Sequence, residues 1–495
     1  MVFTLASFVA VTALVAFISW LKTRGTDETT QEGYFLGGRS LPGIVIFGSL
    51  MMTNLSAEQL VGRNGQGYSV GITAMGWETM CPVALTLMAL FFVPRYLKLG
   101  IATIPQFLED RYDRATRVLV SFIFLVAYIV TMLPLVLYAG SVAMERIFNV
   151  TELLGGNRFL ATTIMCIALG IIGGIYAIFG GLKAVAVSDS LNGVIFIIGA
   201  VVIVPILAFI ILGEGSLITG VQRMISDAPP EHLNAIKSWD AQAPEIPWPM
   251  IILGCSINHI SYWCTNQSII QRIRDGGVLT DFDMAYPTLI HDILPTPVLG
   301  FFAAVMFGAI LSSFNSVLNS SMTLFTLDIL PVISKKERTP QQEITIAKRF
   351  GIVLCLASIV IAPFLIYLPA GISTFLNQMW GYYGVPVLAI ALMGMLNKNI
   401  PSFAPKLTII VHIIAYGVLM NTVPLHFLYF EVGVFFLDLI LLWACAKIKP
   451  RPVPYELKNL EVVDMTPWKF RYPLVIATFV VLAIVYITFS PLGVG

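Results

Sequence analysis

The sequence predicts an all-α protein that crosses a membrane many times, and three observations lead to this fold class. Of the 495 residues, 57% are hydrophobic, and the mean hydropathy is +0.85. Only 12% are charged, against about 25% in globular domains. The apolar residues occur in long runs, and about 20 consecutive apolar residues cross the hydrocarbon core as a helix. A net charge of +1 without a basic tract argues against a nucleic-acid partner and leaves the lipid bilayer as the main surrounding.

Thirteen segments satisfy this length rule, and several exceed it and are expected to tilt. The first, Phe3 to Leu21, is interpreted as a span and not a signal peptide, because it has neither a basic leader nor a small-residue cleavage site. The predicted spans are 3–21, 43–62, 74–96, 116–144, 159–180, 187–212, 247–270, 296–328, 346–369, 374–395, 404–422, 425–446 and 472–491.

Lysine and arginine residues mark cytoplasmic loops, and as far as Arg274 their placement alternates consistently with the spans. The basic loop 329–345 is also predicted to be cytoplasmic, although the single span 296–328 separates it from Arg274. The acidic linker 275–295 predicts no span, because its side chains include Asp281, Asp283, His291 and Asp292 and it has two prolines. One helix is therefore predicted to be missing near residues 273–284. Two alternatives stay open: the charge rule misleads here, or 296–328 folds as a hairpin.

Two spans that are five spans apart carry polar clusters. The first is Thr53-Asn54-Leu55-Ser56-Ala57-Glu58-Gln59, and the second runs from Asn258 to Gln267. Polar groups in a bilayer are costly and often mark a substrate or ion pathway. Transporters with inverted repeats place substrate on broken helices at matching positions of their two halves. The alternative is that these side chains only hold helices together.

Three further features each allow a functional and a structural interpretation. Glu78 could accept hydrogen bonds from a polyhydroxylated ligand, or it could be a cap or salt-bridge partner near the interface. Ser312 and Ser313 could supply oxygen ligands to Na⁺, or they could allow close packing of small residues. Asp189 opens span 187–212 and could line a cation exit path, or it could simply cap the helix N-terminus.

The chain resembles the sodium/solute symporter family, and in particular its bacterial sodium–glucose and sodium–galactose branch. The likeness runs along nearly the whole chain. The motifs that carry it are Thr53 to Gln59, Tyr176-Ala177-Ile178-Phe179-Gly180-Gly181-Leu182-Lys183, Gly308-Ala309-Ile310-Leu311-Ser312-Ser313, Tyr34 to Pro42, Tyr262-Trp263 and Ile270-Gln271-Arg272.

The resemblance implies a LeuT-type fold, a five-plus-five inverted repeat with flanking helices, and sodium-coupled uptake by alternating access. It implies a sodium site of backbone carbonyls and hydroxyls, with Asp189 on the inner exit path and Tyr262 as the inner gate aromatic. The sodium ligands it implies are Met52, Leu55, Ala309, Ser312 and Ser313. The substrate-site residues it implies are Asn54, Gln59, Trp77, Glu78, Cys81, His259, Tyr262 and Gln378.

The sequence departs from the family pattern in ways that bear on the substrate. His259 stands where the family has an asparagine, with Asn258 one place off, and Cys81 replaces a sugar-contacting serine by a weak donor. The family also has a helix between Arg272 and Met284 that carries a sugar-binding lysine, and this chain lacks it. The missing helix agrees with the prediction from the charges. The expected number of spans is therefore about 13, one fewer than in the family.

The chain is therefore expected to form a single transmembrane domain. Its parts are a leading helix and inner loop (1–42), a first repeat (43–213), an incomplete second repeat (247–422) and flanking helices (423–495). The predicted function is sodium-driven symport of an aldohexose such as glucose or galactose across a bacterial inner membrane. The alternative is a transport-inactive or sensor-like protein that has lost a core helix. An enzyme is disfavoured, because no P-loop or HExxH pattern is present.

Overall fold

The computed structural model describes residues 2–24, 71–265 apart from 100, 102 and 244, 296–367 apart from 335, 372–457 and 469–494, with isolated positions between 30 and 70. Every regular element in these ranges is a helix. The helices form two compact units. The first unit comprises Met1–Ser69, Leu125–Ala228 and Gln271–Ser373, and the second comprises Val70–Phe124, Pro229–Ile270 and Thr374–Gly495.

Eleven helices in the described residues are long and apolar enough to cross a membrane, and each corresponds to a predicted span. They are Phe3–Thr23, Gly71–Leu99, Arg114–Phe148, Arg158–Ile178, Val185–Leu212, Leu299–Ile333, Pro340–Tyr367, Thr374–Leu396, Ala404–Thr422, Phe427–Ile448 and Arg471–Thr488. Of the other two predicted spans, 43–62 lies mostly outside the described residues. Span 247–270 is described as far as Thr265, as two short helices.

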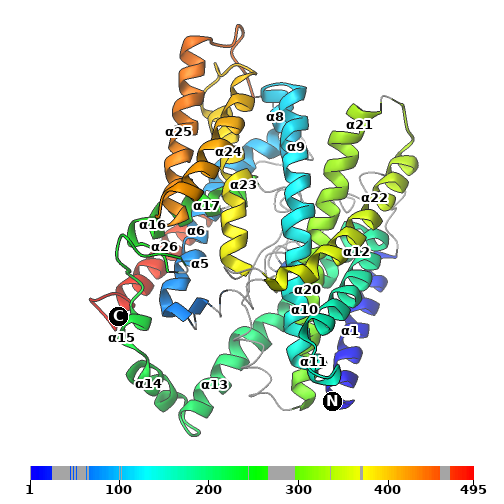
Figure 1. Cartoon of the computed structure of the whole chain (residues 1–495), viewed down its shortest axis with the longest axis vertical. Coiled ribbons are helices and arrows are strands. Elements are labelled where there is room, and N and C mark those ends of the chain that lie inside the picture. The colour runs from blue at the N-terminus through cyan, green and yellow to red at the C-terminus, as the bar shows by residue number, and fades with distance from the viewer. Residues whose placement is uncertain are drawn as a thin grey trace. The chain divides into compact units, whose positions relative to one another are not determined.

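The first unit is built around α20 (Thr296–Thr323), which packs against the other long helices of the unit (Figure 1). Small residues allow these approaches, because a Cβ on Gly300 would overlap the Thr4 carbonyl, and a Cβ on Gly140 would lie 2.7 Å from Ile310. The other elements are α1 (Val2–Thr23), η4 (Tyr128–Met132), α10 (Leu133–Phe148), α11 (Val150–Leu153), α12 (Arg158–Phe196), η5 (Ile197–Ile203), α13 (Val204–Leu212), α14 (Leu217–Asp227), η6 (Leu324–Ile329), α21 (Leu330–Ile333), α22 (Pro340–Ile361) and η7 (Ala362–Tyr367).

The second unit has an aromatic and sulfur-rich core. Trp77 stacks on Phe427 with ring centroids 6.0 Å apart, and Met80, Cys255 and Tyr416 belong to the same buried cluster. The elements are η2 (Gly71–Met75), α5 (Gly76–Thr79), α6 (Cys81–Leu87), η3 (Met88–Phe92), α7 (Val93–Leu99), α8 (Ile104–Arg111), α9 (Arg114–Ala127, shared with the first unit), α15 (Pro230–Leu233), α16 (Trp248–Ile252), α17 (Gly254–Thr265), α23 (Ile372–Leu396), α24 (Ala404–Thr422), α25 (Phe427–Ile448) and α26 (Arg471–Thr488).

The structure contradicts the hairpin alternative for 296–328. One continuous helix of 35 residues runs from Leu299 to Ile333. Its hydroxyl side chains do not break it, because they bond to carbonyls one turn earlier: Ser321 Oγ donates to the Val317 carbonyl and Thr323 Oγ1 to the Asn319 carbonyl, both at 2.8 Å. The linker 275–295 and the predicted gap near 273–284 lie outside the described residues.

The interpretation of Asp189 as a helix N-cap is wrong. The predicted break before residue 187 is absent from the described backbone, and α12 runs through it from Arg158 to Phe196. A glycine pair disfavours a helix by about 1 kcal/mol per residue but keeps both backbone N–H donors, so it does not end the helix as proline would. Asp189 therefore lies in the interior of a helix and is buried.

Candidate functional site

The predicted sodium residues of α20 and the predicted exit-path aspartate of α12 meet at one cavity in the first unit. The cavity has a volume of about 110 Å³ and is lined by three helices. Asp189 lines it from α12 and Ser312 from α20, and Thr12 lines it from the leading helix α1. Two sequence features that were predicted separately therefore belong to one site.

Asp189 is held by its neighbours. Its Oδ2 atom accepts a hydrogen bond of 2.8 Å from the hydroxyl of Ser49. Tyr176, from the Tyr176–Lys183 motif, also lines the cavity, and its hydroxyl lies 3.2 Å from Ser19 Oγ on α1. The buried carboxylate is thus fixed in a wall that contains several hydroxyl groups.

Other polar atoms of the cavity have no partner within the described part of the chain. They are the Ser312 hydroxyl, the Thr12 hydroxyl and both side-chain atoms of the Asn315 amide. A buried hydroxyl or amide without a hydrogen bond costs about 1–3 kcal/mol. A small cation recovers this cost, because hard cations prefer carboxylate, hydroxyl and amide oxygens as ligands. The cavity has room for such an ion, since a water molecule occupies about 30 Å³ in the liquid.

The remaining predicted sodium ligands lie close to these residues where the structure describes them. Ala309 and Ser313 are buried on α20, on either side of Ser312. Met52 is buried, and its Sδ atom would lie 3.7 Å from a Cβ on Gly193, which directly follows the cavity residue Asn192. Leu55 lies outside the described residues.

Sequence reasoning missed four polar residues of the cavity: Thr12, Ser188, Asn192 and Asn315. Asn192 could have been predicted from the sequence, because it follows Asp189 by three residues and therefore shares its helix face. Asn315 stands three residues after Ser312 in the same way. Thr12 could not have been predicted in this way, because only tertiary packing brings α1 against α12 and α20.

The predicted substrate residues of the second unit gather where α5 and α6 meet α17. The His259 ring nitrogen Nε2 contacts the Trp77 carbonyl oxygen. The Trp77 indole is only 2% exposed and belongs to the aromatic core. Cys81 is buried next to Trp263 and close to the half-buried Glu78.

Tyr262 and Gln378 lie in a second group of contacts in this unit. Tyr262 packs edge-on against Trp380 with ring centroids 5.3 Å apart. Gln378 is half-buried on the same helix as Trp380, and its backbone carbonyl accepts a hydrogen bond of 3.3 Å from the Tyr416 hydroxyl. Asn54 and Gln59, the other predicted substrate residues, lie outside the described residues.

Asn258 does not stand in for the family asparagine that His259 replaces. Its amide nitrogen donates to the carboxylate of Glu431 on α25, with a distance of 3.1 Å to Oε2. Both side chains are buried. Asn258 therefore joins α17 to α25, and His259 is the residue that contacts the α5 backbone.

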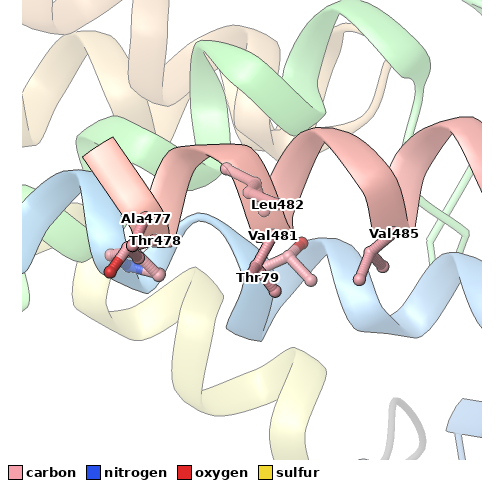
Figure 2. Close-up of a pocket in the computed structure, with 7 residues that line it drawn as sticks. Thr79, Ala477, Thr478, Val481, Leu482 and Val485 are labelled. Carbon is pink, nitrogen blue, oxygen red and sulfur yellow. The ribbon is translucent and has the colours of Figure 1, made fainter. Parts of the chain in front are cut away.

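A larger groove in the second unit has the wrong chemistry for an ion or a sugar. Its volume is about 370 Å³, and it lies between α26 and the start of α6. Figure 2 shows the side chains of Ala477, Val481 and Val485 along α26 beside Thr79. Its described lining contains no charged residue, and α26 itself has no buried residue. This is the surface that a membrane helix presents to lipid.

Comparison with known proteins supports the resemblance to the sodium/solute symporter family. The chain matches the sodium:solute symporter family over residues 34–280 and 275–402. It is 40% identical to the uncharacterized symporter YidK of Escherichia coli (strain K12), over 94% of this chain and 87% of that protein. It is 27% identical to a sodium/glucose cotransporter of Vibrio parahaemolyticus, over 77% of each chain.

The alignment with YidK extends over 500 positions, whereas 94% of 495 residues is about 465, so about 35 positions have no counterpart in this chain. Among solved structures, a sodium-coupled sialic acid symporter in a substrate-bound outward-open state has a TM-score of 0.76 at 20% identity, covering 92% of this chain and 99% of that one. This likeness supports the fold. The chain is therefore an all-α, multi-pass membrane protein with a LeuT-like fold, and it belongs to the sodium:solute symporter family, whose members are sodium-coupled transporters and not enzymes.

Proposed function

We propose that this protein is a sodium-driven sugar symporter that works by alternating access in a bacterial inner membrane. The single observation that carries the proposal is the cavity shared by Asp189 and Ser312, with buried oxygens that have no partner among the described residues. Sodium is the cargo that fits these oxygen donors, and the membrane potential supplies about 2.3 kcal/mol per charge per 100 mV for its entry.

In this proposal Ser312 and Ser313 bind the ion through their hydroxyls, together with the backbone carbonyls of Met52, Leu55 and Ala309. The ion leaves towards Asp189, which lines the same cavity as Ser312. A carboxylate on the exit path attracts the cation without having to bind it tightly, because Ser49 already satisfies one of its oxygens.

The proposed substrate is an aldohexose such as glucose or galactose. Glu78, Gln378, Asn54 and Gln59 offer the carboxylate and amide groups that can pair with several sugar hydroxyls. The sodium/glucose cotransporter of Vibrio parahaemolyticus, 27% identical to this chain, supports this class of substrate. The proposed repeats are 43–213 and 247–422, with the flanking helices after residue 423.

A second candidate function follows from the proposed loss of one core helix near residues 273–284. The family match consists of two segments that meet at 275–280, and about 35 aligned positions of YidK have no counterpart here. Exclusion of the hairpin alternative for 296–328 also supports this loss, because a single helix cannot have both ends in the cytoplasm. A chain without this helix would be transport-inactive or would act as a sensor.

The deciding experiment is uptake of labelled glucose and galactose into vesicles that carry this 495-residue chain, with sodium or potassium outside. The test variant is Ser312→Ala/Ser313→Ala. The matched control is Ser321→Ala, which removes a buried hydroxyl from the same helix but outside the cavity lining. Sodium-dependent uptake that falls about tenfold in the double variant and persists in the control supports symport.

Uptake that does not need sodium would overturn the proposed coupling. No uptake of either sugar by an inserted, folded chain, with sodium still raising its unfolding temperature, would favour the sensor-like alternative. Amplifying and resequencing the coding region would show whether roughly 35 residues are missing from the gene itself.

A further inference from the structure

A basic groove lies at the turn between α21 and α22, in the first unit. We call it the α21–α22 groove. It has a volume of about 490 Å³, and three of its lining residues are cationic: Lys336, Arg338 and Arg349. None of its lining residues is acidic among those the structure describes. Three like charges around one hollow repel one another, so an anion bound there would relieve the repulsion.

The groove is preformed by local hydrogen bonds. Arg338 donates to Ser334 Oγ at 2.6 Å and to the Lys336 carbonyl at 3.1 Å, which fixes the guanidinium at the turn. Thr339 caps α22 through a reciprocal pair of bonds with Gln342. A fixed guanidinium loses less conformational entropy when it binds a ligand than a freely moving one does.

The lining residues of α22 lie on one face of the helix. Gln342, Thr345 and Arg349 recur at intervals of three and four residues, which places them above one another. The Thr345 hydroxyl donates to the Gln341 carbonyl. The charged groups of the lysine and the two arginines are therefore the main donors towards the groove. The positive end of the 22-residue helix α22 adds to this field. Guanidinium groups match phosphate oxygens with paired, charge-assisted hydrogen bonds.

The groove also lies at the edge of the membrane. The candidate spans Leu299–Ile333 and Pro340–Tyr367 end and begin there, and Figure 1 shows the short connection from α21 to α22. Apolar side chains are exposed on both spans next to the cations: Ile333 is 71% and Val353 is 61% exposed. Lipid tails cover such side chains, so the cations lie at the level of the phospholipid headgroups.

We propose that the α21–α22 groove binds a phosphate-bearing anion, and that its occupant is the headgroup of an anionic phospholipid in the inner leaflet. The positive loop predicts the cytoplasmic side, where anionic lipids attract juxtamembrane cations. This site is separate from the proposed sodium and sugar sites, so its test does not depend on the transported substrate.

The test is native mass spectrometry of the purified full chain with added phosphatidylglycerol or phosphatidylcholine. The variant is Lys336→Gln/Arg338→Gln/Arg349→Gln. The matched control is Lys447→Gln/Lys449→Gln/Lys469→Gln, which removes the same charge from exposed positions of the second unit. We expect the groove variant to lose about fivefold in phosphatidylglycerol affinity for each lost charge, and the control to stay within about twofold of the wild type.

Equal phosphatidylglycerol binding by wild type and groove variant, or equal binding of the two lipids by the wild type, would overturn the proposal. Displacement of phosphatidylglycerol by millimolar inorganic phosphate would overturn the lipid assignment in favour of a free phosphate. A charge-retaining variant, Arg338→Lys/Arg349→Lys, separates charge from folding. It should retain preferential phosphatidylglycerol binding, and a loss as large as that of the glutamine variant would contradict the electrostatic basis of the site.

Discussion

The imidazole of His412 on α24 and the carboxylate of Asp438 on α25 form a fully buried pair, with Nδ1 and Oδ2 only 2.6 Å apart. The other ring nitrogen, Nε2, lies 2.9 Å from the Gly381 carbonyl of α23. A carbonyl oxygen only accepts, so Nε2 carries a proton, and Nδ1 and the carboxylate share another. One histidine therefore links three helices of the second unit.

Replacing Asp438 by alanine should destabilise the second unit strongly. The change leaves a buried imidazole without its partner, which typically costs about 3–5 kcal/mol. Thermal unfolding of the detergent-purified protein measures it. The control is Asp240→Ala at an exposed carboxylate, which should change the unfolding temperature little. Similar unfolding temperatures for the two variants would mean that the buried pair contributes nothing to stability.

The stability of the protein should fall between neutral and mildly acidic pH because of His426, the residue that caps α25. Burial lowers the pKa of His426 to about 4, against the opposing effect of a hydrogen bond to the Glu245 backbone. Its Nδ1 atom accepts from the Leu428 N–H at 3.2 Å, which requires a neutral ring at this nitrogen. The unfolded chain takes up a proton near pH 6.5, whereas the folded one resists it until about pH 4. The contribution is complete above pH 6.5 and is lost as the pH falls towards 4.

Unfolding temperatures measured from pH 7 to pH 4 should therefore decline less in His426→Asn than in the wild type, because asparagine can cap a helix without taking up a proton. The loss in the wild type is up to about 3 kcal/mol. His232→Asn, at a half-buried histidine of the same unit, is the control and should keep the wild-type profile. Parallel profiles for all three proteins would exclude His426 as the cause of acid sensitivity.

Arg111 should not tolerate replacement by lysine. Its guanidinium is buried and donates to three carbonyls in the last turn of α23 and just after it, with 2.7 Å to Gly394, 2.7 Å to Asn397 and 3.3 Å to Ile400. The rings of Tyr112 and Tyr455 flank it at 4.5 and 5.0 Å. An ammonium group cannot reach three carbonyls in this planar arrangement.

We expect Arg111→Lys to cost about 2 kcal/mol or more, since it leaves buried carbonyls of a helix end without donors. Arg114→Lys, three residues later at an exposed position, is the matched control for the same chemical change. Limited proteolysis after α23 should become faster in the Arg111 variant alone. Equal proteolysis rates in both variants would contradict a role for Arg111 in holding this helix end.

Runs of apolar residues and the prolines that flank them predicted the spans well, and α24 is an example. Residues 404–422 were predicted and the helix has these bounds, because Pro405 opens it and Pro424 follows it closely. The wrong interpretation of Asp189 came from the glycine pair before it, which weakens a helix without breaking it.

The site was only partly predictable for a different reason. Ser312 and Asp189 were predicted from their motifs, and the structure brings them to one cavity. The contribution of Thr12 depends on which face of α1 packs inward, and the nearly uniform hydrophobicity of that helix does not determine it. Pairs such as Asn258 with Glu431, which are 173 residues apart, require the tertiary fold.

The last prediction concerns the packing of α12 against α20 at the cavity that Asp189 and Ser312 line. A Cβ on Gly308 would lie 2.5 Å from Cγ of Asn192, and both residues line the cavity. Gly308→Ala therefore forces the Asn192 amide aside and should cost about 1–3 kcal/mol, as overpacking typically does. Gly433→Ala in α25 is the matched control, because a Cβ there meets no atom within 4 Å among the described residues and alanine favours a helix by up to about 1 kcal/mol.

The two variants should therefore move the unfolding temperature in opposite directions. The displaced amide should also disturb the proposed cation site, so the rise in unfolding temperature on replacing potassium by sodium chloride should shrink in Gly308→Ala and persist in Gly433→Ala. A destabilised Gly308 variant with an intact response to sodium would mean that Asn192 only packs the two helices together. A full response without destabilisation would mean that the close approach at Gly308 is relieved by a small shift of α20, and that the cavity adapts to it.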